Sequence, residues 1–200
     1  ALEPRAQSEN MQAEDEDKEV EEKEEEKVII KAVPKEGGVF VPPSEDVEGL
    51  SSRGYGTPKD GNLVLTFYEA LYLMSKGIVE VWDEKADRNL TFQELLEKSR
   101  SVHVDAWARY LIYRDLRSRG YVVREGFGLG IDFRVYKRGE YGKSTADYLV
   151  LGIREGQPVT VEDLAQILTH VQSQKKTLIL SVLNRRGEIV YYSLSRLAFE

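Results

Sequence analysis

Length, composition and charge already exclude several classes of protein. The 200 residues carry a formal net charge of −7, no cysteine, two histidines and 41% hydrophobic residues. These values predict a core of ordinary size in one large domain or two small ones, without disulfides or thiolate metal sites. No stretch approaches the roughly 18 apolar residues of a membrane span, and we expect no secretory signal and no zinc site.

The charge is concentrated in one segment near the beginning of the chain. Residues 14–27 hold ten acids and three lysines, so residues 28–200 are close to neutral with a charge of +1. A dense run of like charge with few aromatic residues predicts disorder over residues 1–27, with a solvated helix as the alternative. The remainder is expected to be a soluble protein of the cytoplasm. The 32% charged residues of the whole chain are typical of a thermophile.

The first elements expected along the chain, up to Gly77, are a mixture of strands and a helix. A strand is expected over residues 27–33, followed by loops at the glycines and prolines of residues 37–43 and by a glycine-rich connection into a short strand at residues 63–65. Thr66 and Glu69 then form a capping box, which predicts a helix that ends near Gly77.

Two further helices are expected before the pattern changes. Residues 78–82 are typical of a strand, and Thr91 with Glu94 opens a second helix through a capping box. A longer helix is predicted over residues 102–119, because Val104, Trp107, Tyr110 and Leu111 form an apolar stripe and Gly120 stops it. We place the boundary between a small N-terminal α/β domain (28–100) and a C-terminal domain (101–200) in this region.

Past Gly120 the hydrophobic period becomes that of strands. Five segments are rich in Val, Ile, Leu, Phe and Tyr, namely residues 121–125, 130–136, 147–153, 176–183 and 188–194. One helix interrupts them, with Thr160 as its cap and one face formed by Val161, Leu164, Ile167, Leu168 and Val171. The fold class is therefore α/β (α+β), with a mixed central sheet flanked by helices in the C-terminal domain.

Few residues suggest chemistry on local grounds. Ile131, Phe133 and Val135 alternate with polar neighbours, so Tyr136 is expected to face outward, either for chemistry or as an ordinary strand tyrosine. Lys176 precedes a buried strand, where its charge could meet a phosphate or simply be solvated. The glycines of residues 126–130 precede a strand, so they form a bend and not a dinucleotide loop.

From about residue 50 onward, ordered segments resemble the archaeal tRNA-splicing (tRNA-intron) endonuclease family. "RGYGTPKDGNLVLTFYEALYLMSKGIVEVWD" is similar to its N-terminal domain. "YLIYRDLRSRGYVVREGFGLGIDFRVYKRG", "ADYLVLGI" and "KKTLILSVLNRRGEIVYYSLSR" are similar to its catalytic domain. The resemblance implies a restriction-endonuclease-like C-terminal fold and metal-independent cleavage of pre-tRNA at a bulge-helix-bulge, leaving 2′,3′-cyclic phosphate and 5′-hydroxyl ends.

The resemblance also implies where the chemistry would lie. The family uses a tyrosine as base, a histidine as acid and a lysine as cation; Tyr136 and Lys176 match the tyrosine and the lysine. The histidine position is occupied by Thr145. A threonine hydroxyl does not donate a proton usefully near neutral pH, and His103 and His170 are interpreted as surface or capping residues, with a rescue by His170 as the alternative.

This departure predicts a structural subunit of a heterotetramer, which pairs two such chains with two catalytic chains. Arg185, Arg186 and Arg196 are candidate contacts for RNA or the partner, or plain surface charges, and the last strand would suit pairing across a subunit interface or within its own monomer. No metal and no small-molecule cofactor are expected. The alternative is an active endonuclease chain in which Tyr136 and Lys176 work with a substituted or displaced acid.

Overall fold

A computed structural model describes residues 28–196 of the chain. The predicted acidic tail over residues 1–27 lies outside the described residues, as do the last four residues. The described part contains five helices and two mixed sheets. Among residues 28–196, no helix combines the length and the apolar character that crossing a bilayer requires.

The first sheet is built from residues 30–89 and has the strand order β3-β4-β2-β1-β5-β6. Strands β1 and β5 are parallel, and the other neighbours are antiparallel. The elements of this half are β1 Ile30–Lys35, β2 Gly38–Val41, α1 Glu45–Ser52, β3 Thr57–Lys59, β4 Asn62–Leu65, α2 Phe67–Ser75, β5 Val79–Asp83, β6 Arg88–Asn89 and α3 Phe92–Val102.

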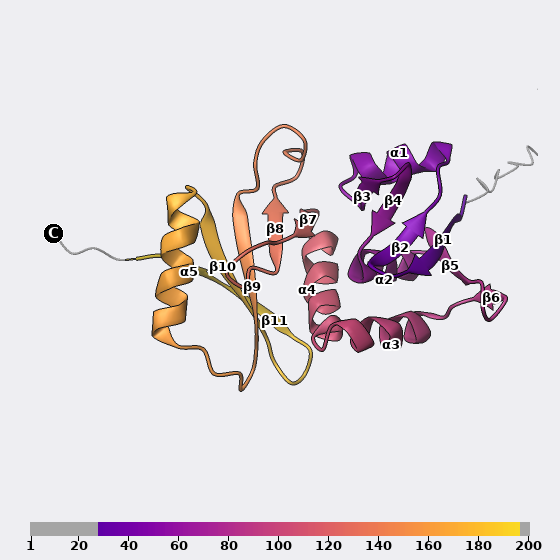
Figure 1. Cartoon of the computed structure of the whole chain (residues 1–200). Coiled ribbons are helices and arrows are strands. Elements are labelled where there is room, and N and C mark those ends of the chain that lie inside the picture. Colours follow the sequence, from indigo (N-terminus) through magenta and orange to yellow (C-terminus); the bar gives the residue numbers. More distant parts are fainter. Residues whose placement is uncertain (1–27, 197–200) are drawn as a thin grey trace, which may run out of the picture.

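The second sheet has the order β11-β10-β9-β8-β7, in which β9 and β10 are parallel and the remaining neighbours antiparallel. Its elements are α4 Ala106–Ser118, β7 Val122–Glu125, β8 Phe133–Tyr136, β9 Tyr148–Arg154, α5 Val161–Ser173, β10 Thr177–Leu183 and β11 Ile189–Leu194. Figure 1 shows α5 on the outer face of this sheet and α4 between the two sheets. The predicted mixed sheet flanked by helices is confirmed.

Capping boxes explain why α2 and α3 begin where they do. The Thr66 hydroxyl accepts the N–H of Glu69 while the Glu69 carboxylate accepts the N–H of Thr66, and Thr91 and Glu94 repeat the arrangement. Each box satisfies backbone N–H groups that a helix start leaves without partners. Both helix starts predicted from sequence are confirmed.

Three predictions about local structure are wrong. Strand β2 lies where a loop was expected at residues 37–43, because Gly37, at φ +88°, turns the chain into the β1–β2 hairpin. Strand β3 and the end of α1 likewise lie in the expected glycine-rich connection before residue 63. Helix α4 begins at Ala106, not at Val102, and Val104 and Trp107 are exposed instead of lying on its buried stripe. On α5, Val161 is exposed too, whereas Leu168 and Val171, further along the helix, are buried.

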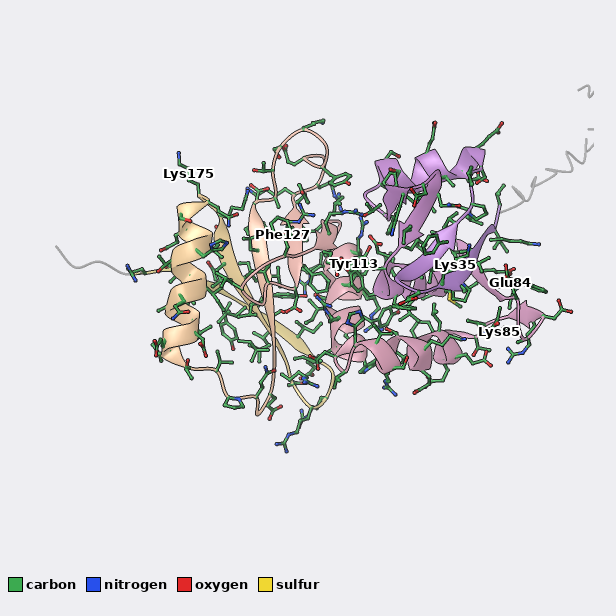
Figure 2. The ribbon with its side chains drawn as sticks, viewed as in Figure 1. Lys35, Glu84, Lys85, Tyr113, Phe127 and Lys175 are labelled. Atoms are coloured by element: carbon green, nitrogen blue, oxygen red, sulfur yellow. The ribbon has the colours of Figure 1, made fainter. Side chains whose placement is uncertain are left out.

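The main core runs through both sheets. One cluster of buried residues joins strands of the first sheet, helices α2 and α4, and strands of the second sheet. Tyr113 of α4 is fully buried and contacts the rings of Tyr68, Tyr72 and Phe133. Figure 2 shows Tyr113 at the centre, between the two sheets. A smaller cluster lies between α5 and the outer face of the second sheet.

Candidate active site

The second sheet brings three predicted site residues to one end. Tyr136 is the last residue of β8, Thr145 lies three residues before β9, and Lys176 immediately precedes β10. Strand β9 is antiparallel to β8 and parallel to β10, so the end of β8 meets the starts of β9 and β10. The backbone confirms this junction, because the Asp147 N–H donates to the Val135 carbonyl (3.1 Å) and the Thr177 N–H to the Asp147 carbonyl (3.1 Å).

Lys176 and Thr145 contact each other directly. The Lys176 Nζ donates to Thr145 Oγ1 at 2.9 Å and also to the carbonyl oxygen of Ala146. An ammonium group has three donors, so one remains for a ligand. The lysine is half-buried and the threonine is exposed. The geometry thus orients a cation at an open edge, where it can meet an anionic oxygen.

Tyr136 differs from the sequence prediction. The alternation of buried Ile131, Phe133 and Val135 is confirmed, but the Tyr136 ring is not exposed on the other face: only 9% of the residue is accessible. The ring of Tyr141, from the loop between β8 and β9, packs edge-to-face on it at 5.1 Å and covers it. The Tyr136 hydroxyl makes no hydrogen bond within residues 28–196. It is nevertheless not one of the fully buried polar atoms that lack a partner there.

Neither His103 nor His170 is hydrogen-bonded to the candidate site within the described residues. His103 is the C-terminal cap of α3, where a helix start was predicted, and it belongs to the opposite half of the molecule from Lys176. His170 lies in the last turn of α5, with a ring nitrogen 2.7 Å from the Gln174 side-chain amide. In the part of the chain that the structure covers, no hydrogen bond joins either ring to Tyr136, Thr145 or Lys176.

Comparison with known proteins decides the family. Residues 106–191 match the family model described as tRNA intron endonuclease, catalytic C-terminal domain, and residues 24–96 match its N-terminal domain. The chain is 32% identical over 149 residues to the tRNA-splicing endonuclease of Pyrococcus abyssi, covering 74% of this chain and 85% of the relative.

The chain belongs to the tRNA intron endonuclease family.

Other relatives agree. The tRNA-splicing endonuclease of Pyrococcus furiosus is 34% identical, over 72% of this chain and 81% of its own length. That of Methanococcus vannielii is 33% identical, over 76% and 86% respectively. The resemblance inferred from separate sequence segments is thereby confirmed at the level of the family.

In this tRNA intron endonuclease chain, the three candidate arginines do not form one site. Arg185 and Arg186 lie in the turn between β10 and β11, at the end of the sheet opposite to Lys176. Arg185 is attached to Glu155, which accepts its backbone N–H at 3.0 Å and lies 3.9 Å from its Nε. Strand β11 ends at Leu194, whose partner in β10 is Leu178, and Arg196 comes two residues later. Arg196 therefore lies at the Lys176 end of the sheet.

Sequence reasoning missed the polar contacts that join the two halves. Glu69 of α2 is almost fully buried and pairs with Arg124 of β7 at 3.2 Å, while Arg124 also donates to the carbonyl of Gly54. Burial raises the pKa of Glu69, and the charge of Arg124 opposes that shift. Arg117 donates to the same Gly54 carbonyl and lies 3.9 Å over the Tyr55 ring. The "GYG" turn is the signal that could have located this junction.

No described group of residues suggests a metal centre. Within residues 28–196, no cluster of three or more His, Cys, Asp or Glu side chains has an arrangement that could hold a metal ion. Asp147, whose carboxylate pairs with Lys137 at 3.3 Å, also lies at the junction of β8, β9 and β10. The predicted site groups there are a tyrosine hydroxyl, a threonine hydroxyl and an ammonium. These groups can bind and orient a phosphodiester, and general-acid catalysis would need a further proton donor.

Proposed function

We propose that this chain is the structural, non-catalytic subunit of a heterotetrameric tRNA-splicing endonuclease. In this assembly two copies pair with two catalytic chains of the same fold, and the whole cleaves pre-tRNA at the bulge-helix-bulge. Cleavage would leave 2′,3′-cyclic phosphate and 5′-hydroxyl ends without metal or cofactor. The names and the archaeal origin of the relatives support the substrate and a cytoplasmic location.

The single observation that carries the proposal is the contact between Thr145 and Lys176. Attack by a 2′-hydroxyl requires a base, a cation for the phosphorane-like transition state and an acid for the departing 5′ oxygen. Here the acid position holds a hydroxyl that accepts a hydrogen bond from the lysine at 2.9 Å. Its proton is held too tightly near neutral pH to be transferred to the leaving oxygen.

The N-terminal and C-terminal units are part of the proposal. We infer that the chain divides near residue 100, and the two family models, which match residues 24–96 and 106–191, support a boundary between α3 and α4. Arg196, at the Lys176 end of the sheet, is proposed as an RNA contact. Arg185 and Arg186, at the other end, are proposed as contacts to the partner.

An active chain is the second candidate, and one observation favours it. Tyr136 and Lys176 are both retained at the same end of the sheet, and the Tyr136 hydroxyl has no hydrogen-bond partner within residues 28–196 that would occupy it. In that case Tyr136 would be the base, Lys176 the cation, and a substituted or displaced group the acid.

Cleavage assays distinguish the two candidates. The purified chain is incubated in EDTA with bulge-helix-bulge RNA, alone and together with a family chain that carries the tyrosine, the histidine and the lysine. We expect no cleavage by this chain alone and cyclic-phosphate products after the second chain is added. Robust cleavage by the single chain would refute the structural role.

A further inference from the structure

An open hollow lies on the face of the second sheet that α4 covers only in part. Its volume is about 290 Å³. Aliphatic side chains of α4, β8, β9 and β10 form its floor, and Tyr121, Tyr148, Tyr191 and Arg119 form its walls. The volume is close to the lower end of the range for small-molecule sites, roughly 300 Å³. Nothing in the candidate active site makes use of this hollow.

The walls are held in place by contacts within the chain. The Tyr191 hydroxyl donates to Asp115 at 2.7 Å, and Arg119 Nε donates to the same carboxylate oxygen at 2.8 Å. Burial and this hydrogen bond raise the pKa of Tyr191, so its hydroxyl remains a neutral donor. Across the hollow, the rings of Tyr121 and Tyr148 meet edge-to-face at 6.4 Å. The hollow is therefore preformed.

Cations accompany two of these rings. The Arg119 guanidinium lies 5.4 Å from the Tyr191 ring, and the Lys137 ammonium lies 5.7 Å from the Tyr148 ring. The Nη groups of Arg119 make no hydrogen bond within residues 28–196, and more than half of that side chain is exposed. Flat aromatic walls, an apolar floor and a free planar donor suit a flat ring with polar edges, which is the chemistry of a nucleobase.

The hollow lies at the same end of the sheet as Lys176. Tyr148 is the register partner of both Val135 and Thr177, which are the chain neighbours of Tyr136 and Lys176. Val135 points toward α4 and the hollow, so Tyr136 points to the opposite face. A single RNA strand that crosses this end of the sheet can therefore place a phosphate near Lys176 and a neighbouring base in the hollow.

We propose that the tyrosine-walled hollow binds an unpaired nucleobase of the RNA substrate, stacked on Tyr148 and hydrogen-bonded at its edge by Arg119. The inference rests on the proposed function only in taking RNA as the substrate. It adds a role for this chain in reading the unpaired bases of a bulge, whether or not the chain cuts. An apolar side chain of a partner protein would fill the floor but would leave the Arg119 donors unused.

The test measures binding of the full chain to a hairpin RNA with a short bulge that carries 2-aminopurine, and to the same hairpin fully paired. Stacking on an aromatic side chain quenches this fluorophore. We expect Tyr148→Leu, which keeps the apolar volume, to abolish the quenching and to weaken binding of the bulged RNA by about 5- to 150-fold. Tyr148→Trp should retain both, and binding of the paired RNA should not change.

Tyr192→Ala is the matched control, because Tyr192 is exposed on the opposite face of β11 and does not line the hollow. Thermal unfolding monitored by circular dichroism verifies that each variant is folded. The inference is overturned if folded Tyr148→Leu binds and quenches as the unmodified chain does. If the same variant also lowers the mass of the assembly in sedimentation, the hollow is a protein interface.

The two proposals fail separately. Cleavage by this chain alone, with binding still dependent on Tyr148, would contradict the structural role and leave the nucleobase site standing. If the chain alone does not cleave RNA and substitution of Tyr148 leaves RNA binding unchanged, only the nucleobase site is contradicted.

Discussion

At the scale of single residues, Thr145 decides what the candidate site can do. Its hydroxyl and the Ala146 carbonyl hold the Lys176 ammonium at the start of β10, so the cation is oriented without a ligand. If Thr145 stands at the position of the acid, as proposed, the site keeps the means to bind a phosphodiester but has no group there that can donate the proton.

Restoring an imidazole at this position should restore cleavage. We expect Thr145→His to raise single-chain cleavage of bulge-helix-bulge RNA by about 10²- to 10⁴-fold over the unmodified chain, the range typical of a general acid. Product formation is followed in EDTA by gel electrophoresis, with Thr145→Ser as the control that keeps the hydroxyl. No increase in a folded, RNA-binding variant would mean that a missing acid is not what limits this chain.

A second residue-scale prediction concerns the buried pair between the two halves. The Glu69 and Arg124 side chains are only 3% and 14% exposed. Replacing Arg124 with Ala leaves a buried carboxylate without its cation, which should cost about 3 to 5 kcal/mol in the free energy of unfolding. Urea unfolding measures this loss. Arg88→Ala, which breaks the exposed pair with Glu94, should cost much less, and equal losses in the two variants would contradict the prediction.

At the scale of elements, the capping boxes were predictable and the break between α3 and α4 was not. Thr66 with Glu69 and Thr91 with Glu94 fix helix starts through local hydrogen bonds, so a short sequence window contains the whole signal. Between Val102 and Ala106 there is no glycine or proline. Asp105 precedes α4 without a side-chain cap and instead pairs with Arg154 at 2.6 Å, a contact between segments that are distant in the sequence.

In the candidate site, too, the features that depend on segments distant in the sequence could not be predicted. The family resemblance brought Tyr136, Thr145 and Lys176 into one hypothesis, and the strand register brings them to one end of a sheet. The exposure of Tyr136 depended on Tyr141, which lies in a loop whose path no periodicity specifies. The tyrosine-walled hollow likewise joins residues of five separate elements and the turn after α4, so no local pattern points to it.

The start of α3 gives an element-scale prediction about pH. A hydrogen bond from Arg88, and then those from Thr91, lower the pKa of Glu94 from the usual 4.5 to about 2. A carboxyl group whose pKa is depressed on folding stabilises the fold above its unfolded pKa, and this contribution is lost as the pH falls from about 4.5 toward 2. Glu94→Gln should therefore flatten the pH dependence of thermal stability in this interval. An unchanged acid profile would contradict the assignment.

At the scale of the whole molecule, three parts of the second sheet carry candidate contacts: its two ends and the edge strand β11. Tyr136, Lys176 and the tyrosine-walled hollow lie at one end of the second sheet, and Arg185 and Arg186 lie at the other. Strand β11 is at the edge of that sheet, with Val190 and Tyr192 about half exposed. Within residues 28–196 no further strand pairs with the outer edge of β11. A strand edge with exposed apolar side chains pairs readily with another chain, which would suit the assembly proposed above.

The most direct measurement is single-turnover cleavage, at saturating enzyme, by the complex of this chain with a catalytic partner. Tyr136→Phe is introduced in this chain alone and removes only the hydroxyl that a catalytic subunit would need as base. The account predicts that the rate of cleavage stays the same as that of the unmodified complex. A loss of about 10²-fold or more would show that Tyr136 acts in catalysis and would contradict the structural role.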